Sequence, residues 1–137
     1  MNISGRCDYA CRAMLELAAR YNAGGPVPAQ IIAEHRDIPE KYLTHILLQL
    51  KRSGLVRSMR GAQGGYTLVD APEKIVLLDI IEAIDGPIII PTNTEDAPGS
   101  ELRVIWETVA RDTRKSLQRL TLRKMLDVTT RMHMYHI

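Results

Sequence analysis

Apolar residues recur at intervals of three and four along most of the chain, which is the spacing of helices that bury one face. In the first half this spacing predicts three helices, over residues 4–22, 28–35 and 39–53. Ser4 is a suitable N-cap for the first helix, and Gly54 is expected to end the third. Between the second and third helices we predict a tight turn at Arg36 and Asp37, because aspartate tolerates the left-handed conformation.

Two short β-type runs follow the third helix, at residues 55–58 and 66–69. The segment between them is rich in glycine, so the two runs predict a hairpin with a long tip. Three helices followed by a β-ribbon are typical of a winged helix-turn-helix.

The second half is predicted to be helical again. We expect a short helix at 77–85, a loop at 88–100, a long helix at 101–119 and a last short helix that begins after Thr121. His133 and His136 would then lie in a frayed tail. The expected fold is mainly α with a small β wing. Its expected units are a winged helix-turn-helix domain (1–87), the loop (88–100), and the dimerisation helix with the C-terminal helix and tail (101–137).

Charge and composition narrow the class of protein. The formal net charge is only +2, but residues 51–60 hold a group of cations without an acidic residue, as phosphate contact requires: Lys51, Arg52, Arg57 and Arg60. A solvated polar surface is the alternative. With no apolar run of bilayer length and no signal-like start, we expect a cytoplasmic protein.

The start of the third helix and the hairpin tip are the candidate DNA contacts. In a recognition helix the first two turns meet base edges and phosphates, and here they carry Lys41, Tyr42, Thr44 and His45. The alternative is a core position for Tyr42 and a merely solvated His45.

The tip presents Arg60 beside Gly61 and Gln63, and a lone arginine of this kind fits a narrow minor groove. A plain flexible hairpin is the alternative. A phosphate-binding glycine loop is disfavoured, since these glycines lead into a strand.

The long helix at 101–119 has an apolar stripe too large for a surface helix of so small a protein. We therefore expect it to form a homodimer through Leu102, Ile105, Trp106 and Val109, so that two recognition helices meet a palindromic operator. Packing of this stripe onto its own domain is the alternative.

Catalytic and metal-binding patterns find little support. No nucleophile elbow, metalloprotease helix or paired carboxylates occur, so we do not expect an enzyme. Cys7 and Cys11 lie four residues apart, more typical of small apolar fillers than of ligands. A metal site from Cys7, Asp8 and Cys11 with a tail histidine is possible to draw, but nothing in the spacing demands it, and we predict no metal and no cofactor.

Several segments together resemble one known family. They are residues 3–18, 32–34, 38–43, 47–66 and 79–87. The most specific is the string Gly-Leu-Val-Arg-Ser-Met-Arg-Gly-Ala-Gln-Gly-Gly-Tyr at positions 54–66. The chain is similar to the IscR/NsrR/CymR-type regulators of the Rrf-two (Rrf2) family, in register over 2–87 and more loosely over 101–127.

The resemblance implies a dimeric winged-helix regulator, with the recognition helix in the major groove and the wing arginine in the minor groove. It also places Ser4 and Arg6 near the DNA backbone. Iron–sulfur members of the family carry three cysteines in the loop before the long helix, whereas residues 88–100 contain none here. Asp8 matches a carboxylate ligand of some cluster-binding members, but without the cysteines we expect no cluster.

The leading hypothesis is a sequence-specific transcriptional regulator, a repressor, that binds a palindromic double-stranded DNA operator as a homodimer. Its effector, a protein or a small molecule, is unknown from sequence. One alternative is a metal or redox sensor that uses Cys7, Asp8 and Cys11. Another is a winged-helix module that binds a protein, which the arginine at the wing tip disfavours.

Overall fold

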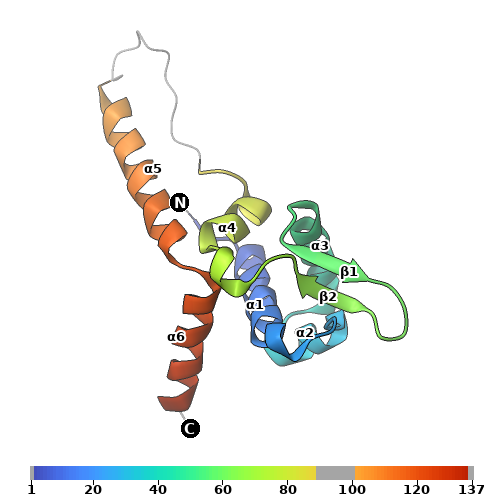
Figure 1. Cartoon of the computed structure of the whole chain (residues 1–137). Coiled ribbons are helices and arrows are strands. Elements are labelled where there is room, and N and C mark those ends of the chain that lie inside the picture. The colour runs from blue at the N-terminus through green and yellow to red at the C-terminus, as the bar shows by residue number, and fades with distance from the viewer. Residues whose placement is uncertain (1, 89–100, 136–137) are drawn as a thin grey trace.

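Three helices form the centre of the molecule in this computed structural model, which describes residues 2–88 and 101–135 (Figure 1). They are α1 (Gly5–Ala19), α2 (Ala29–Arg36) and α3 (Glu40–Arg52). Each buries most of its apolar stripe, and Met14, Ile32 and Leu47 are fully buried. Ser4 caps α1 as expected, because its Oγ accepts a hydrogen bond from the Cys7 amide at 3.0 Å.

The turn between α2 and α3 has the predicted left-handed residue. Asp37 has φ 53° and ψ 55°, which swings the chain round after α2. The next residue, Ile38, is buried, and its amide donates to the Ala33 carbonyl at 3.0 Å. Pro39 is then extended and serves as the N-cap residue of α3. The turn of the helix-turn-helix is thus stabilised by the backbone hydrogen bond of Ile38 and by the burial of its side chain in the core.

Strands β1 (Val56–Met59) and β2 (Gly65–Leu68) form the antiparallel wing. The outer edge of β2 also pairs with the helical head, which is formed by α1 to α3 (residues 5–52), since Val27 and Tyr66 exchange two backbone hydrogen bonds of 2.9 Å. Gly65 makes this close approach possible. A Cβ there would lie 2.4 Å from the Val27 carbonyl group, and its φ of 151° disfavours other residues.

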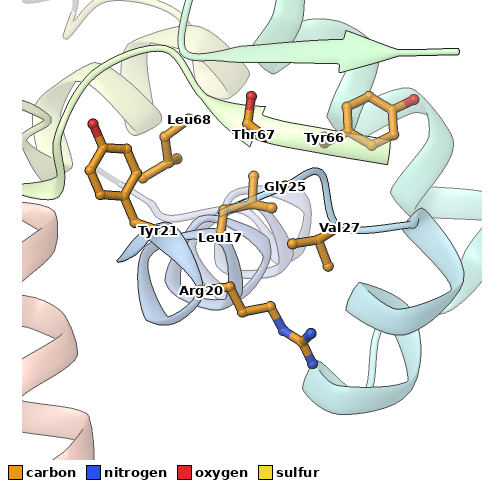
Figure 2. A pocket seen from close by; sticks show the side chains of 8 residues that line it. All are labelled: Leu17, Arg20, Tyr21, Gly25, Val27, Tyr66, Thr67 and Leu68. Carbon is orange, nitrogen blue, oxygen red and sulfur yellow. The ribbon is translucent and has the colours of Figure 1, made fainter. Parts of the chain in front are cut away.

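A cavity of about 120 Å³ lies at the base of the wing, between α1 and β2 (Figure 2). The side chains of Leu17, Val27 and Leu68 gather around it, whereas the guanidinium of Arg20 points away.

Helices α4 (Leu77–Asp85) and α6 (Leu122–Tyr135) both pack on α1, while α5 (Leu102–Arg119) touches α4 and extends away from the head (Figure 1). Backbone hydrogen bonds of 2.8 and 2.7 Å, from Leu77 to Leu120 and from Leu122 to Ile75, fix the corner between α5 and α6. Single 3-10 turns occur at Tyr21–Ala23 and Pro72–Lys74.

The C-terminal helix differs most from its prediction. It was expected to be short, but α6 continues to Tyr135, so His133 is helical and not in a frayed tail. Only its first turns are packed in the core, where Leu122 and Leu126 join α1, whereas residues 130–134 are exposed. Through Leu122 and Leu126, α6 packs on α1. His136 and most of the loop expected at 88–100 lie outside the described residues.

Smaller differences concern the boundaries of predicted elements. Helix α1 ends at Ala19, where the sequence predicted residue 22, and both strands are displaced by one residue from the predicted runs. None of the helices within the described ranges is long and apolar enough to cross a membrane.

Candidate nucleic-acid interface

The outer face of α3 carries the polar residues that sequence analysis assigned to a recognition helix. Its inner face is buried through Leu43, Ile46, Leu47 and Leu50. Lys41, Thr44 and His45 are exposed on the opposite side. Thr44 donates its hydroxyl to the Glu40 carbonyl at 3.3 Å, so this residue is partly engaged within the helix. Because α3 is amphipathic, its polar residues Lys41, Thr44 and His45 face away from the core.

Tyr42 is exposed to 43% and does not occupy the core position that the sequence left open. Its ring stacks on Tyr9 of α1, with the ring centroids 6.1 Å apart. Sequence analysis did not identify this role of Tyr9. The sequence offered only the aromatic character of Tyr9 as a signal for this contact, and the structure shows that the residue is half-buried.

The start of α1 lies beside the candidate interface. Arg6 is exposed and donates a hydrogen bond to the Gln49 side chain of α3. Ser4 already has partners, since its Oγ donates to the Asp85 carboxylate at 2.6 Å and accepts from the Cys7 amide. Arg6 thus lies next to α3, whereas the Ser4 hydroxyl connects the start of α1 to the end of α4.

The wing tip is small and presents one cation. Arg60, Gly61 and Gln63 are all exposed, and Arg60 has no ion-pair partner in the described part of the chain. Gly64 keeps the tip narrow, because a Cβ there would lie 2.2 Å from the Met59 carbonyl oxygen. Arg57, on β1, is exposed as well and adds a second guanidinium to the ribbon.

Comparison with known proteins identifies the family. The sequence pattern of Rrf2, described as an iron-dependent transcriptional regulator, matches residues 3–128. The chain belongs to the Rrf2 family. The HTH-type transcriptional regulator CymR of Bacillus subtilis is 33% identical over 129 residues, which cover 94% of this chain and 92% of that protein. IscR of Erwinia tasmaniensis is 30% identical over 132 residues, covering 93% and 79%.

A solved structure agrees with these sequences. The structure of CymR (YrzC), the global cysteine regulator of B. subtilis, matches with a TM-score of 0.80 at 31% identity, and the match covers 93% of this chain and 98% of that one. As an Rrf2 protein the chain is a DNA-binding transcriptional regulator with a winged helix-turn-helix, which confirms the predicted fold class and the prediction of a DNA-binding regulator. The family is one of regulators and not of enzymes.

Helix α5 leaves its N-terminal apolar face uncovered in this Rrf2 chain. Leu102, Ile105, Trp106 and Val109 are exposed to between 43% and 55%. Ala110 and Leu117 are the buried residues of α5, and Leu117 packs with Cys7 and Leu78. The described residues therefore do not cover the stripe, contrary to the alternative in which it packs onto its own domain.

The description of the Rrf2 family as iron-dependent raises the question of whether this chain fits an iron site. Its two cysteines both lie on α1, where Cys7 is fully buried beside Leu78 and Leu117. The hydrogen bond between the two thiols lowers the pKa of Cys7 and, together with burial, raises the pKa of Cys11, so Cys11 disfavours the thiolate that iron requires. Within the described residues no three His, Cys, Asp or Glu side chains are grouped for a metal ion, and residues 88–100 contain no cysteine. The residues present do not fit an iron–sulfur cluster.

Proposed function

We propose that the chain is a repressor that binds a palindromic operator as a homodimer, with α3 in the major groove and the wing tip in the adjacent minor groove. The observation that carries this proposal is the distribution of unpaired cations. Arg12, Arg20 and Arg36 of the head are in ion pairs. The cations of α3 and the wing have no acidic partner among the described residues: Lys41, Lys51, Arg52, Arg57 and Arg60. Cations of α5 and α6 such as Arg111, Lys115 and Arg131 also lack one, but they lie outside the helix-turn-helix and the wing.

Two kinds of contact follow from the exposed side chains. Lys41 is suited to phosphate, and His45 is suited to a base edge, because an imidazole both donates and accepts hydrogen bonds. Arg60 is suited to a narrow minor groove, where the negative potential is enhanced. Gly61 and Gln63 would accompany Arg60 into the groove, and Arg6 would lie against the DNA backbone.

Dimerisation is supported by the uncovered stripe of α5. A second copy would cover the stripe and place two recognition helices on a two-fold axis, which matches an inverted repeat in DNA. A dimer bound to a promoter would block access of RNA polymerase, so repression is the simplest consequence of binding.

Enrichment of random duplexes on the purified protein tests the proposal. We expect an inverted repeat whose half-sites are about 10–10.5 base pairs apart or a multiple of that spacing. Raising the salt concentration from about 50 to 200 mM should lower the affinity at least tenfold, since phosphate contacts release counterions.

The control removes a charge elsewhere. Lys115→Gln on α5 should leave the salt dependence unchanged, whereas Arg57→Gln should reduce it. Failure to enrich any sequence, or enrichment of a single site without a repeat, would contradict the proposal.

A further inference from the structure

Stacked side chains run from α1 to two of the candidate DNA contacts on α3, Lys41 and Tyr42, and include two α1 residues that have no assigned role. The guanidinium of Arg12 lies 5.2 Å from the centroid of the Tyr9 ring. The Tyr9 and Tyr42 rings stack at 6.1 Å with an angle of 16° between their planes, and the Lys41 ammonium lies 5.0 Å from the Tyr42 centroid. Both cations are within the range of an attractive cation–π contact.

The α1 end of this stack is fixed. Tyr9 is half-buried against the main core, so its position follows that of α1. Arg12 is held by an ion pair of 2.8 Å with Asp8, and it donates to the Asp37 carbonyl at 3.4 Å. Because Asp37 is the turn residue between α2 and α3, Arg12 connects the stack to the start of the recognition helix.

The α3 end is open. Tyr42 is exposed to 43%, and its hydroxyl has no hydrogen-bond partner among the described residues. An exposed tyrosine normally loses rotamer freedom when it binds, at a cost of about 0.5–1.5 kcal/mol for such a side chain. A ring already held by two neighbours has lost part of that freedom in the unbound protein.

We infer that Tyr9 and Arg12 are positioning residues for DNA recognition, which hold the Tyr42 ring so that its hydroxyl meets the operator. The inference rests on the proposed function, because it requires α3 to lie on DNA. Since Tyr9 and Lys41 both lie against the ring, the hydroxyl is the group of Tyr42 that remains available for a hydrogen bond. Tyr42 therefore acts as a hydrogen-bonding residue and not as a stacking platform for bases.

A double-mutant cycle tests this coupling, with the duplex enriched by the parent protein as the probe and fluorescence anisotropy as the measurement. Tyr42→Phe keeps the ring and removes the hydroxyl, which should lower the affinity about three- to tenfold, the value of one neutral hydrogen bond. Tyr9→Leu should cause a similar loss in the parent but almost none in the Tyr42→Phe background. Tyr9→Phe should restore parental affinity because it retains the stack. Tyr21→Leu, the same change at a tyrosine without a ring contact, should have no effect.

Two results would overturn the inference. One is an equal loss from Tyr9→Leu in both backgrounds, which would indicate a general effect on the fold. The other is a change in the salt dependence on Arg12→Gln, which would make Arg12 a direct phosphate contact; we expect weaker binding with the salt dependence unchanged.

A second measurement separates this inference from the proposed function. If the parent enriches no duplex, the proposed function fails. The stack is then tested in the free protein, where Tyr9→Leu should shift the NMR signals of the Tyr42 ring protons. Unshifted signals would refute the positioning role by themselves.

Discussion

Glu16 connects α1 to α2 and is the buried charged residue among those described, with 5% of its surface exposed. Its carboxylate accepts hydrogen bonds from Arg20 Nε at 2.6 Å and from Arg36 Nε at 2.9 Å, and His35 Nδ1 lies 3.1 Å away. Arg36 and His35 belong to the last turn of α2, which has only 8 residues and is too short to be stable alone. We predict that Glu16→Gln loosens α2 and lowers the stability of the fold.

The expected size of the effect follows from the exposure of the partners. Removing one partner of a fully buried ion pair costs about 3–5 kcal/mol. The Arg20 and Arg36 side chains retain 37% and 25% exposure, so water compensates part of their lost pairing. We therefore expect a loss of about 1–3 kcal/mol in the free energy of unfolding, as for hydrogen bonds to a charged group.

The loss should depend on pH. Burial opposes ionisation of Glu16, but the hydrogen bonds from Arg20 and Arg36 outweigh it and lower the pKa of its carboxyl below the ordinary 4.5. A lowered pKa in the folded state contributes stability that is complete above the unfolded pKa and lost as the pH falls through the folded pKa. The difference between parent and Glu16→Gln should be full at pH 7 and shrink only in acid below the unfolded value.

Urea unfolding followed by circular dichroism measures this difference at each pH. Glu73→Gln is the control, because Glu73 pairs with Arg123 at the surface and should change the stability little. A Glu16→Gln protein as stable as the parent at pH 7, or a difference that persists unchanged in acid, would refute the reasoning.

Three further predictions concern the interface, the iron question and the wing. Arg60→Ala and His45→Ala should each cost about 1–3 kcal/mol in operator binding. The first should weaken mainly operators with A·T-rich flanks, and the second should relax preference at one position per half-site, as binding to a panel of altered duplexes would show; two silent variants would contradict the assigned contacts. Purified protein should be colourless without stoichiometric iron by metal analysis, and a brown protein would contradict this. Gly65→Ala should push β2 away from Val27 and lower the melting temperature, so an unchanged melting curve would refute the close approach.

The helical head and the wing were predictable because the residues that cap, turn and end the helices agreed with the apolar periodicity between them. Ser4 caps α1, Asp37 takes the left-handed turn and Gly54 follows α3 with φ 77°. These residues act through their own backbone, so their roles can be inferred from a single sequence.

Features that depend on contacts distant in sequence were not predictable in this way. Helix α6 packs on α1 through Leu122 and Leu126, and the apolar periodicity of one helix does not show which other helix it contacts. Likewise, the stack of Tyr9 and Tyr42 joins residues more than thirty positions apart. The Ser4 hydroxyl was assigned to DNA by resemblance alone, whereas its bond to Asp85 depends on where α4 ends.

Trp106 offers the sharpest test of the dimer. It is exposed to 43% on the uncovered stripe of α5, so in a single chain its removal would cost little. In a dimer the same indole would be buried, and truncating a buried aromatic anchor typically costs 2 kcal/mol or more, about a thirtyfold change in the dissociation constant. Trp106→Ala should therefore shift sedimentation toward the monomer and weaken operator binding, because the two half-sites are no longer bound together. Val104→Ala removes an apolar side chain exposed to 68%, but two positions along a helix do not share a face, so this variant should remain dimeric. If Trp106→Ala sediments as the parent does and binds the operator equally well, Trp106 does not contribute to a dimer interface.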